Sequence, residues 1–272
     1  MAGTFAFLLK GQGLNLLLNW FFGPVINAAR GLAYQINTAV SGFSSNITLA
    51  YRPQMVSSHA AGDNERTRKL MFSESRICFC LIALLITPVI IEMEPLLHLW
   101  LGPEVPAHTA SFAALVLIDT LICTLNAPCT QVVYAVGKIR RYQIWTTLLN
   151  LCLLPVCWVL LKCGCKAEAA FTATIIFSCI LQAISLVLTR QVFPFTWRSY
   201  FSEVLLKCLA TAILLPVLPL AVHHLTIPAI PRVLLVCLAT LVVAIPVFGL
   251  IVLNASERQF LLSRFRKTQD NE

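Results

Sequence analysis

Apolar segments, each of about 20 residues, follow one another along the whole chain and are separated by short polar linkers. An α-helix of that length crosses the roughly 30 Å hydrocarbon layer of a membrane. Because a helix satisfies its own backbone hydrogen bonds, it is the form expected for each segment in lipid. The pattern predicts an all-α integral membrane protein with about eight transmembrane helices. The predicted spans are residues 3–22, 25–51, 77–97, 109–136, 143–161, 168–189, 204–223 and 232–253.

The composition agrees with this class. Of the 272 residues, 58% are hydrophobic and 12% are charged, and the mean hydropathy is +0.81. A soluble domain carries roughly 25% charged residues, so this chain is short of the surface that water requires. We therefore expect one transmembrane helical domain over residues 1–272, ending in a short cytoplasmic tail at 254–272. A signal peptide at the N-terminus is the alternative to a first span. It is disfavoured because residues 1–9 carry no positive charge and Lys10 interrupts the apolar run.

Lysine and arginine are unevenly divided between alternate linkers. One set of linkers and the tail hold fifteen of them, the other set holds three, and Lys10 and Arg30 lie within spans. Because basic linkers stay in the cytoplasm, this imbalance places the tail there, and an even number of spans places Met1 there too. The basic clusters also explain the net charge of +8 without nucleic acid, which is not a predicted partner. The larger set is Arg52, Arg66, Arg68, Lys69, Arg76, Lys138, Arg140, Arg141, Arg190, Arg198, Lys207, Arg258, Arg264, Arg266 and Lys267, and the smaller is Lys162, Lys166 and Arg232.

No signature of an enzyme, metal site or cofactor site is found in the sequence. The motifs HExxH and GxSxG, a phosphate-binding P-loop and paired carboxylates are all missing. Most of the eleven cysteines lie within apolar segments, where cysteine behaves as a small hydrophobic residue. The pairs Cys78/Cys80 and Cys163/Cys165 lack the second pair or the histidines that a zinc site needs. We therefore predict that the protein is not an enzyme and that it binds neither a cofactor nor a metal ion.

Polar residues of the second span share one face. At about 100° per residue they fall within an arc of about 80°, so a polar stripe runs along the whole helix. A helix that faces lipid has no use for such a stripe, and we expect it to face a water-filled cavity or another polar helix. The stripe consists of Asn27, Arg30, Tyr34, Asn37, Ser41, Ser45, Thr48 and Arg52.

The fourth span has a polar face as well, formed by Asp119, Cys123, Asn126 and Thr130. An ionisable group at bilayer depth is costly, so Asp119 is a candidate functional residue. The alternative is a structural pairing, for instance with Lys10. Asn126, like Gln12, Asn15 and Asn19 of the first span, is equally well explained as a hydrogen-bonding contact between helices.

Three stretches of the sequence resemble bacterial polysaccharide flippases, the O-antigen and exopolysaccharide exporters of the superfamily that also contains the MATE multidrug exporters. The resemblance covers essentially the whole chain, and the string NAARG…AYQIN…RPQ is fairly specific to it. The stretches are FAFLLKGQGLNLLLNWFFGPV, GPVINAARGLAYQINTAVSGFSSNITLAYRPQMVSSHAAGDNERTRKL and LLHLWLGPEVPAHTASFAALVLIDTLICTLNAPCTQVVYAVGKIRRYQ.

The resemblance implies a fold, a substrate and a location. Family members have two six-helix lobes around a central cavity, often with two further helices, and the eight spans would correspond to the second lobe plus these two. The first lobe has no counterpart here, which implies a truncated form or a half that pairs with a complementary N-terminal half. The implied activity is transfer of a lipid-linked oligosaccharide across the bacterial inner membrane by alternating access.

The same resemblance implies roles for individual residues. Arg30 would contact the diphosphate of the substrate, and Asn27, Asn37 and Asn126 would be polar substrate-binding residues. Asp119 would couple transport to H⁺ or Na⁺, because the charge of a membrane carboxylate governs its cost in the bilayer.

Three other functions stay open. A MATE-like, cation-coupled multidrug exporter would favour a cavity of acidic and aromatic residues over one with Arg30. A membrane-embedded enzyme of the polysaccharide pathway would need a larger extramembrane segment than any predicted linker. An inactive fragment is the third.

Overall fold

The computed structural model describes residues 2–253 and residue 258. Within this part of the chain almost every residue is helical and no strand is present, which confirms the all-α class. The predicted tail, with Arg264, Arg266 and Lys267, lies outside the described residues except for Arg258. The helices are α1 (Ala2–Phe22), α2 (Pro24–Ala60), α3 (Asn64–Ile91), α4 (Met93–Leu101), α5 (Thr109–Val136), α6 (Ile139–Lys162), α7 (Glu168–Val192), α8 (Trp197–Tyr200), the π-helical turn η1 (Phe201–Leu205), α9 (Leu206–Leu214), α10 (Val217–His223), α11 (Ala229–Val247) and the π-helical turn η2 (Phe248–Val252).

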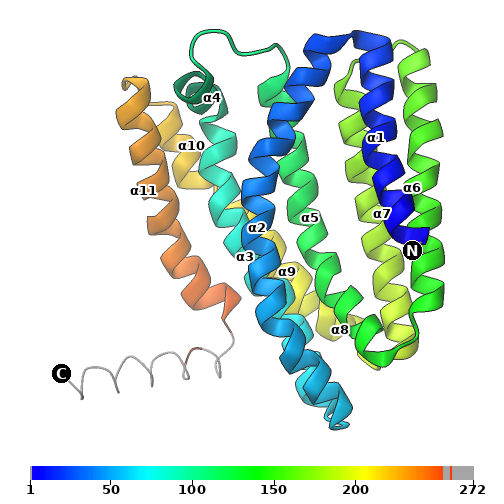
Figure 1. Ribbon diagram of the computed structural model, residues 1–272. Coiled ribbons are helices and arrows are strands. Elements are labelled where there is room, and N and C mark those ends of the chain that lie inside the picture. Colours follow the sequence, from blue (N-terminus) through cyan, green and yellow to red (C-terminus); the bar gives the residue numbers. More distant parts are fainter. Residues whose placement is uncertain (1, 254–257, 259–272) are drawn as a thin grey trace.

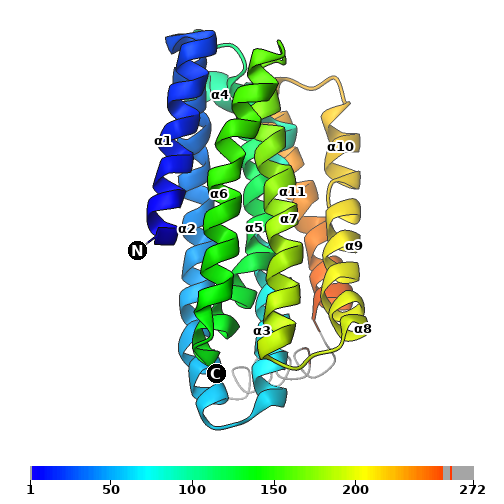
Figure 2. The same cartoon turned by 90° about the vertical axis from the view of Figure 1, so that its right-hand side faces the viewer.

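The long helices run side by side as a bundle with α5 near its middle, where it packs against α2, α3 and α7 (Figure 1). On one side α1 packs against α6 and α2, and on the other α10 packs against α11. Helices α8, α9 and α10 are stacked along one side of the bundle (Figure 2). The bundle therefore brings both polar helices of the sequence, α2 and α5, into direct contact.

Six helical segments of the described chain are long and apolar enough to cross a membrane. These are α3, α5, α6, α7, the α8–α10 segment and the α11–η2 segment. Helices α1 and α2 are also long, but their polar residues keep them out of this group. The outer surface of the bundle carries many large apolar side chains, as a surface that faces lipid must; Trp20, Ile245 and Leu250 are 87%, 75% and 71% exposed. The protein has the character of a multi-pass membrane protein.

Residues 52–76, between the predicted spans 25–51 and 77–97, are largely helical. Helix α2 continues to Ala60 and α3 begins at Asn64, so the two form a helical hairpin that extends beyond the neighbouring helix ends (Figures 1 and 2). Asp63 ends the turn by accepting a hydrogen bond from the backbone N–H of Arg66 at 2.9 Å, a helix cap of the usual kind.

Arg76 is also not the linker charge that the sequence pattern suggested. It lies inside α3 and is 1% exposed, and its guanidinium donates to the backbone carbonyl of Glu203 at 3.3 Å. A buried arginine needs such acceptors, because an isolated buried charge is costly. Arg76 therefore joins α3 to the π-helical turn η1.

Two predicted spans are interrupted. The span at 77–97 changes direction at Glu92, between α3 and α4. The span at 204–223 starts earlier, at Trp197, and breaks between α9 and α10 next to Pro216. Proline lacks the N–H that would continue the helix and clashes with the preceding turn.

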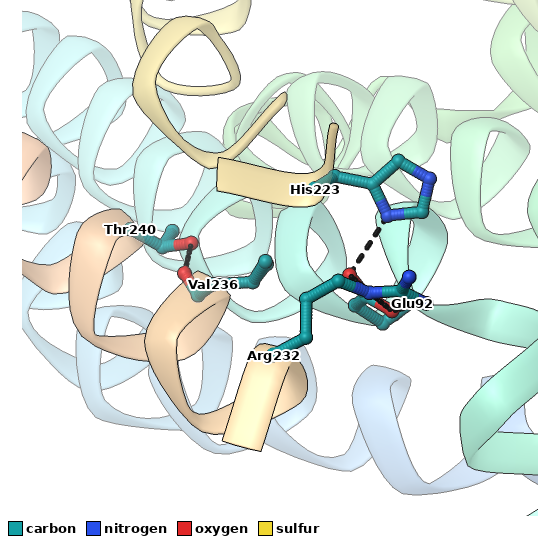
Figure 3. Close-up of polar contacts among 5 residues, drawn as sticks. All are labelled: Glu92, His223, Arg232, Val236 and Thr240. Atoms are coloured by element: carbon teal, nitrogen blue, oxygen red, sulfur yellow. Dashed lines mark hydrogen bonds and ion pairs between the residues drawn. The ribbon is translucent and has the colours of Figure 1, made fainter. Parts of the chain in front are cut away.

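At the break between α3 and α4, Glu92 binds two residues from the C-terminal part of the chain (Figure 3). Its carboxylate is 1% exposed. Arg232, in the first turn of α11, donates from Nε to Oε1 and from Nη2 to Oε2, both at 3.0 Å. The ring nitrogen Nδ1 of His223, at the end of α10, lies 2.8 Å from Oε1. This Glu92 cluster fastens α10 and α11 to α3 and α4.

We expect Glu92→Ala to destabilise the protein by about 3–5 kcal/mol, because it leaves the Arg232 guanidinium half-buried and unpaired. The midpoint of thermal unfolding of the detergent-purified protein measures this. Glu94→Ala is the matched control, since Glu94 is an exposed acid two residues away. Equal midpoints for the two variants would show that the cluster does not hold the helices together.

Candidate substrate cavity

A cavity of about 370 Å³ lies between α1, α2, α5 and α7. Polar and ionisable side chains form much of its wall, although the helices around it are those of an apolar bundle. We call it the central cavity. It is lined by Phe7, Lys10, Gly11, Leu14, Tyr34, Asn37, Ser41, Ser44, Ser45, Asp119, Thr120, Cys123, Thr124 and Thr174.

Helix α2 supplies the polar wall of this cavity. Four of the eight stripe residues line it: Tyr34, Asn37, Ser41 and Ser45. The two serine hydroxyls donate to carbonyls one turn earlier in the same helix, Ser41 to Asn37 at 2.8 Å and Ser45 to Ser41 at 3.0 Å. Their oxygens keep lone pairs with which they can accept hydrogen bonds from a solute. The middle of the stripe, from Tyr34 to Ser45, thus faces a cavity.

Helix α5 supplies the opposite wall. Thr120 donates to Oδ1 of Asn37, so the two polar helices are hydrogen-bonded to each other across the rim of the cavity. The neighbouring Asp119 lies ten residues after the start of α5, about 15 Å along the helix. Its Oδ1 is buried and has no hydrogen-bond partner. A buried carboxylate oxygen without a donor is costly, and such a position is typical of a functional group.

Helix α1 adds the cation of the cavity, Lys10. The sequence pattern suggested a structural pair between Lys10 and Asp119. Both residues line the same cavity, but among residues 2–253 and 258 they form no ion pair with each other. One cationic and one anionic group therefore face the central cavity separately, and each is able to meet a solute.

Arg30 does not line the central cavity. Its Nη2 donates to the backbone carbonyl of Gly11 at 2.9 Å and its Nη1 to Oδ1 of Asn15 at 3.4 Å. The guanidinium also stacks over the ring of Tyr34, 4.6 Å from its centre, an attractive cation–π contact. Arg30 thus ties α2 to α1 and holds Tyr34, itself a cavity residue.

The other predicted binding residues lie outside the cavity wall. Asn126 accepts hydrogen bonds from the hydroxyl of Tyr142 at 3.0 Å and from that of Thr130 at 3.3 Å. It joins α5 to α6, which agrees with the interhelical alternative. Asn27 lies in the first turn of α2, and its buried Oδ1 has no hydrogen-bond partner.

Another buried acid, in addition to Glu92, was missed in the sequence because it lies between the predicted spans 25–51 and 77–97. Glu74 of α3 is 0% exposed, and its Oε1 accepts from Nε2 of Gln131 on α5 at 2.6 Å. Its Oε2 is buried without a partner. The signal that could have found it is the pair Glu74 and Arg76 directly before an uninterrupted apolar run, since a helix continuing backwards would bury both.

Comparisons with known proteins add no further assignment. No family model matches the chain, and neither a curated protein nor a solved structure matches it. Among the described residues, no three His, Cys, Asp or Glu side chains are placed to hold a metal ion. What the central cavity can bind is therefore inferred from its own lining residues.

The contrast between Asp119 and Arg30 gives a testable expectation. Asp119→Asn should leave the thermal midpoint unchanged or raise it, because the buried Oδ1 makes no hydrogen bond that could be lost. Arg30→Met should lower stability by about 1.5–3 kcal/mol, the usual contribution of a hydrogen bond to a charged group. Thermal unfolding of both purified variants tests this. Equal destabilisation by the two would assign Asp119 a structural partner.

Proposed function

We propose that this protein is a transporter of the polysaccharide-flippase type, which moves a lipid-linked oligosaccharide across the membrane by alternating access. The observation that supports this most is the central cavity, where Lys10 and Asp119 face the same space inside an apolar bundle. Placing ionisable groups at bilayer depth costs several kcal/mol each. Because Lys10 and Asp119 form no ion pair with each other that would offset this cost, we expect them to bind a solute.

The cavity wall suits the headgroup of such a substrate. The ammonium of Lys10 would attract a diphosphate, and the hydroxyls of Ser41, Ser45 and Thr120 with the amide of Asn37 would meet sugar hydroxyls. Its volume of about 370 Å³ lies within the usual range of ligand pockets. Arg30 acts indirectly in this proposal, by holding Tyr34 against the cavity.

Asp119 would couple transport to H⁺ or Na⁺, because its unpartnered oxygen can take up a proton or a cation without breaking an existing bond. The same feature, together with the ring of Tyr34 in the wall, favours a cation-coupled exporter of drugs as the second candidate. The cargo distinguishes the two, since a drug exporter would move an organic cation and would be hindered by Lys10.

The uneven distribution of Lys and Arg supports an orientation for this transporter. The ends that carry the α2–α3 hairpin, the α5–α6 turn and the α7–α8 connection lie together at one end of the bundle (Figure 1). We place this basic end in the cytoplasm of a bacterial cell and the protein in its inner membrane, with both termini on the cytoplasmic side.

Transport of a fluorescent polyprenyl-diphosphate oligosaccharide between the leaflets of proteoliposomes tests the proposal. The chain is reconstituted alone and together with a first six-helix lobe of a flippase. Lys10→Gln and Asp119→Asn should each slow transport at least about tenfold, the effect of losing one charged hydrogen bond, at an unchanged amount of folded protein.

Lys162→Gln and Glu94→Gln are the controls, because they remove one exposed charge of each sign outside the central cavity. Both should transport at the rate of the unmodified protein. Movement of an organic cation that is accelerated by Lys10→Gln would favour the drug exporter. Unchanged oligosaccharide transport in both cavity variants would overturn the proposal.

A further inference from the structure

A second cavity, of about 450 Å³, opens at the turn between α5 and α6. Three cationic residues line it: Lys138, Arg140 and Arg141. All three are exposed, and none of the ion pairs within residues 2–253 and 258 involves them. We call it the α5–α6 pocket. Its other lining residues are Val133, Tyr142, Leu188, Gln191 and Val192, so no acidic residue of the described chain lines it.

The α5–α6 pocket is lined by both cationic and apolar side chains. Val133, Leu188 and Val192 form its apolar wall, at the ends of α5 and α7. The guanidinium of Arg141 donates to Oε1 of Gln191 on α7 at 3.4 Å, which holds it close to the apolar residues of that helix. A ligand that fits both kinds of lining residue carries a negative charge next to a hydrocarbon part. A lipid with a phosphate headgroup has that combination.

The depth of the pocket in the membrane agrees with a lipid headgroup. Tyr134, four residues before Lys138, and Trp145, four residues after Arg141, are 41% and 43% exposed. Trp197, five residues after the lining residue Val192, is exposed as well, and the guanidinium of Arg190 lies over its ring. Tyrosine and tryptophan gather at the membrane–water interface, where headgroups lie. We therefore expect the three cations to lie at the level of lipid phosphates.

No acidic side chain lies in the first turn of α6, where it would interact favourably with the helix dipole. Lys138 precedes the first residue of α6 and gives its N–H groups no side-chain hydrogen bond, and the first turn contains Arg140 and Arg141 but no acid. Cations at this end of a helix are repelled by its dipole. Basic residues elsewhere in the turn would serve equally to keep it in the cytoplasm. The position of Arg140 and Arg141 beside the pocket is explained if a bound anion offsets their repulsion by the helix dipole.

We propose that the α5–α6 pocket binds the phosphate headgroup of a membrane lipid, with Lys138, Arg140 and Arg141 as its ligands. The phosphate belongs to an anionic phospholipid of the bilayer or to the diphosphate of a lipid-linked substrate before it is transported. This site is separate from the central cavity. Binding of a bilayer phospholipid there does not depend on the proposed transport activity, whereas binding of the lipid-linked substrate rests on it.

Native mass spectrometry of the full chain, purified in detergent, tests the site by counting bound lipids. The probes are phosphatidylglycerol, a polyprenyl diphosphate, zwitterionic phosphatidylcholine and inorganic phosphate. The unmodified protein should retain phosphatidylglycerol or polyprenyl diphosphate and release phosphatidylcholine. The triple variant Lys138→Gln/Arg140→Gln/Arg141→Gln should bind the retained lipid at least about tenfold more weakly, since each charge near a headgroup contributes severalfold.

The matched control removes three charges from the same end of the bundle, with Arg66→Gln, Arg68→Gln and Lys69→Gln in the α2–α3 hairpin. It should bind lipid like the unmodified protein. An equal loss in both triple variants, or in neither, would overturn the site. Binding of inorganic phosphate without either anionic lipid would also overturn it. Displacement of phosphatidylglycerol by polyprenyl diphosphate would identify the substrate as the ligand, and resistance to displacement would identify a phospholipid.

A single variant guards against a loss of binding through misfolding. Lys138→Asp places an anion at the start of α6 and should raise the thermal midpoint of the lipid-free protein. Added anionic lipid, which stabilises the unmodified protein by binding its folded state, should no longer raise the midpoint of this variant. A full lipid-induced shift in Lys138→Asp would contradict the proposal.

Discussion

The polar face of α2 must be kept away from lipid, and the arrangement of the bundle follows from this constraint. A charged side chain such as Arg30 and a row of amides and hydroxyls cannot face hydrocarbon without a large cost. Helix α1 covers Arg30, whose guanidinium donates hydrogen bonds to the Gly11 carbonyl and the Asn15 side chain of that helix. Helix α5 covers Asn37, whose Oδ1 accepts a hydrogen bond from Thr120 of that helix. Both helices are thereby drawn to the same side of α2, and the space between them is the central cavity.

The remaining faces of these helices make the close packing possible. Ala29 and Ala33 of α2 are 0% exposed and belong to an apolar cluster with Phe112 and Leu117 of α5, so small side chains let the helices approach. Helix α1 approaches α6 at Gly13, where an added Cβ would lie 2.7 Å from Leu154. Apolar packing thus fixes the helix positions, and the polar contacts determine which faces meet.

The sequence was sufficient for the class of the fold and for the direction of the α2 stripe, because both depend on local periodicity. It was not sufficient for the ends of α2 and α3. Hydropathy reports where a helix is apolar, and this pair continues as a polar hairpin beyond the apolar part, which is why Glu74 and Arg76 were assigned to a linker. In the Glu92 cluster, Glu92 binds His223 and Arg232, which lie 131 and 140 positions further along the chain. No local sequence pattern encodes such a contact. The cavity role of Lys10 was missed for the same reason, because it depends on how α1 is placed against α5.

A transport cavity between α1, α2 and α5 must be open to water, and a native cysteine can test this directly. Cys123 lines the central cavity, Cys129 is buried six residues further along α5, and Cys152 is exposed on α6. Three proteins that each keep one of these cysteines are treated in native membranes with a charged, water-soluble thiol reagent. The account predicts rapid labelling of Cys123 and little labelling of Cys129 or Cys152. Labelling of Cys123 no faster than that of the other two would show that the cavity is dry and would contradict the account.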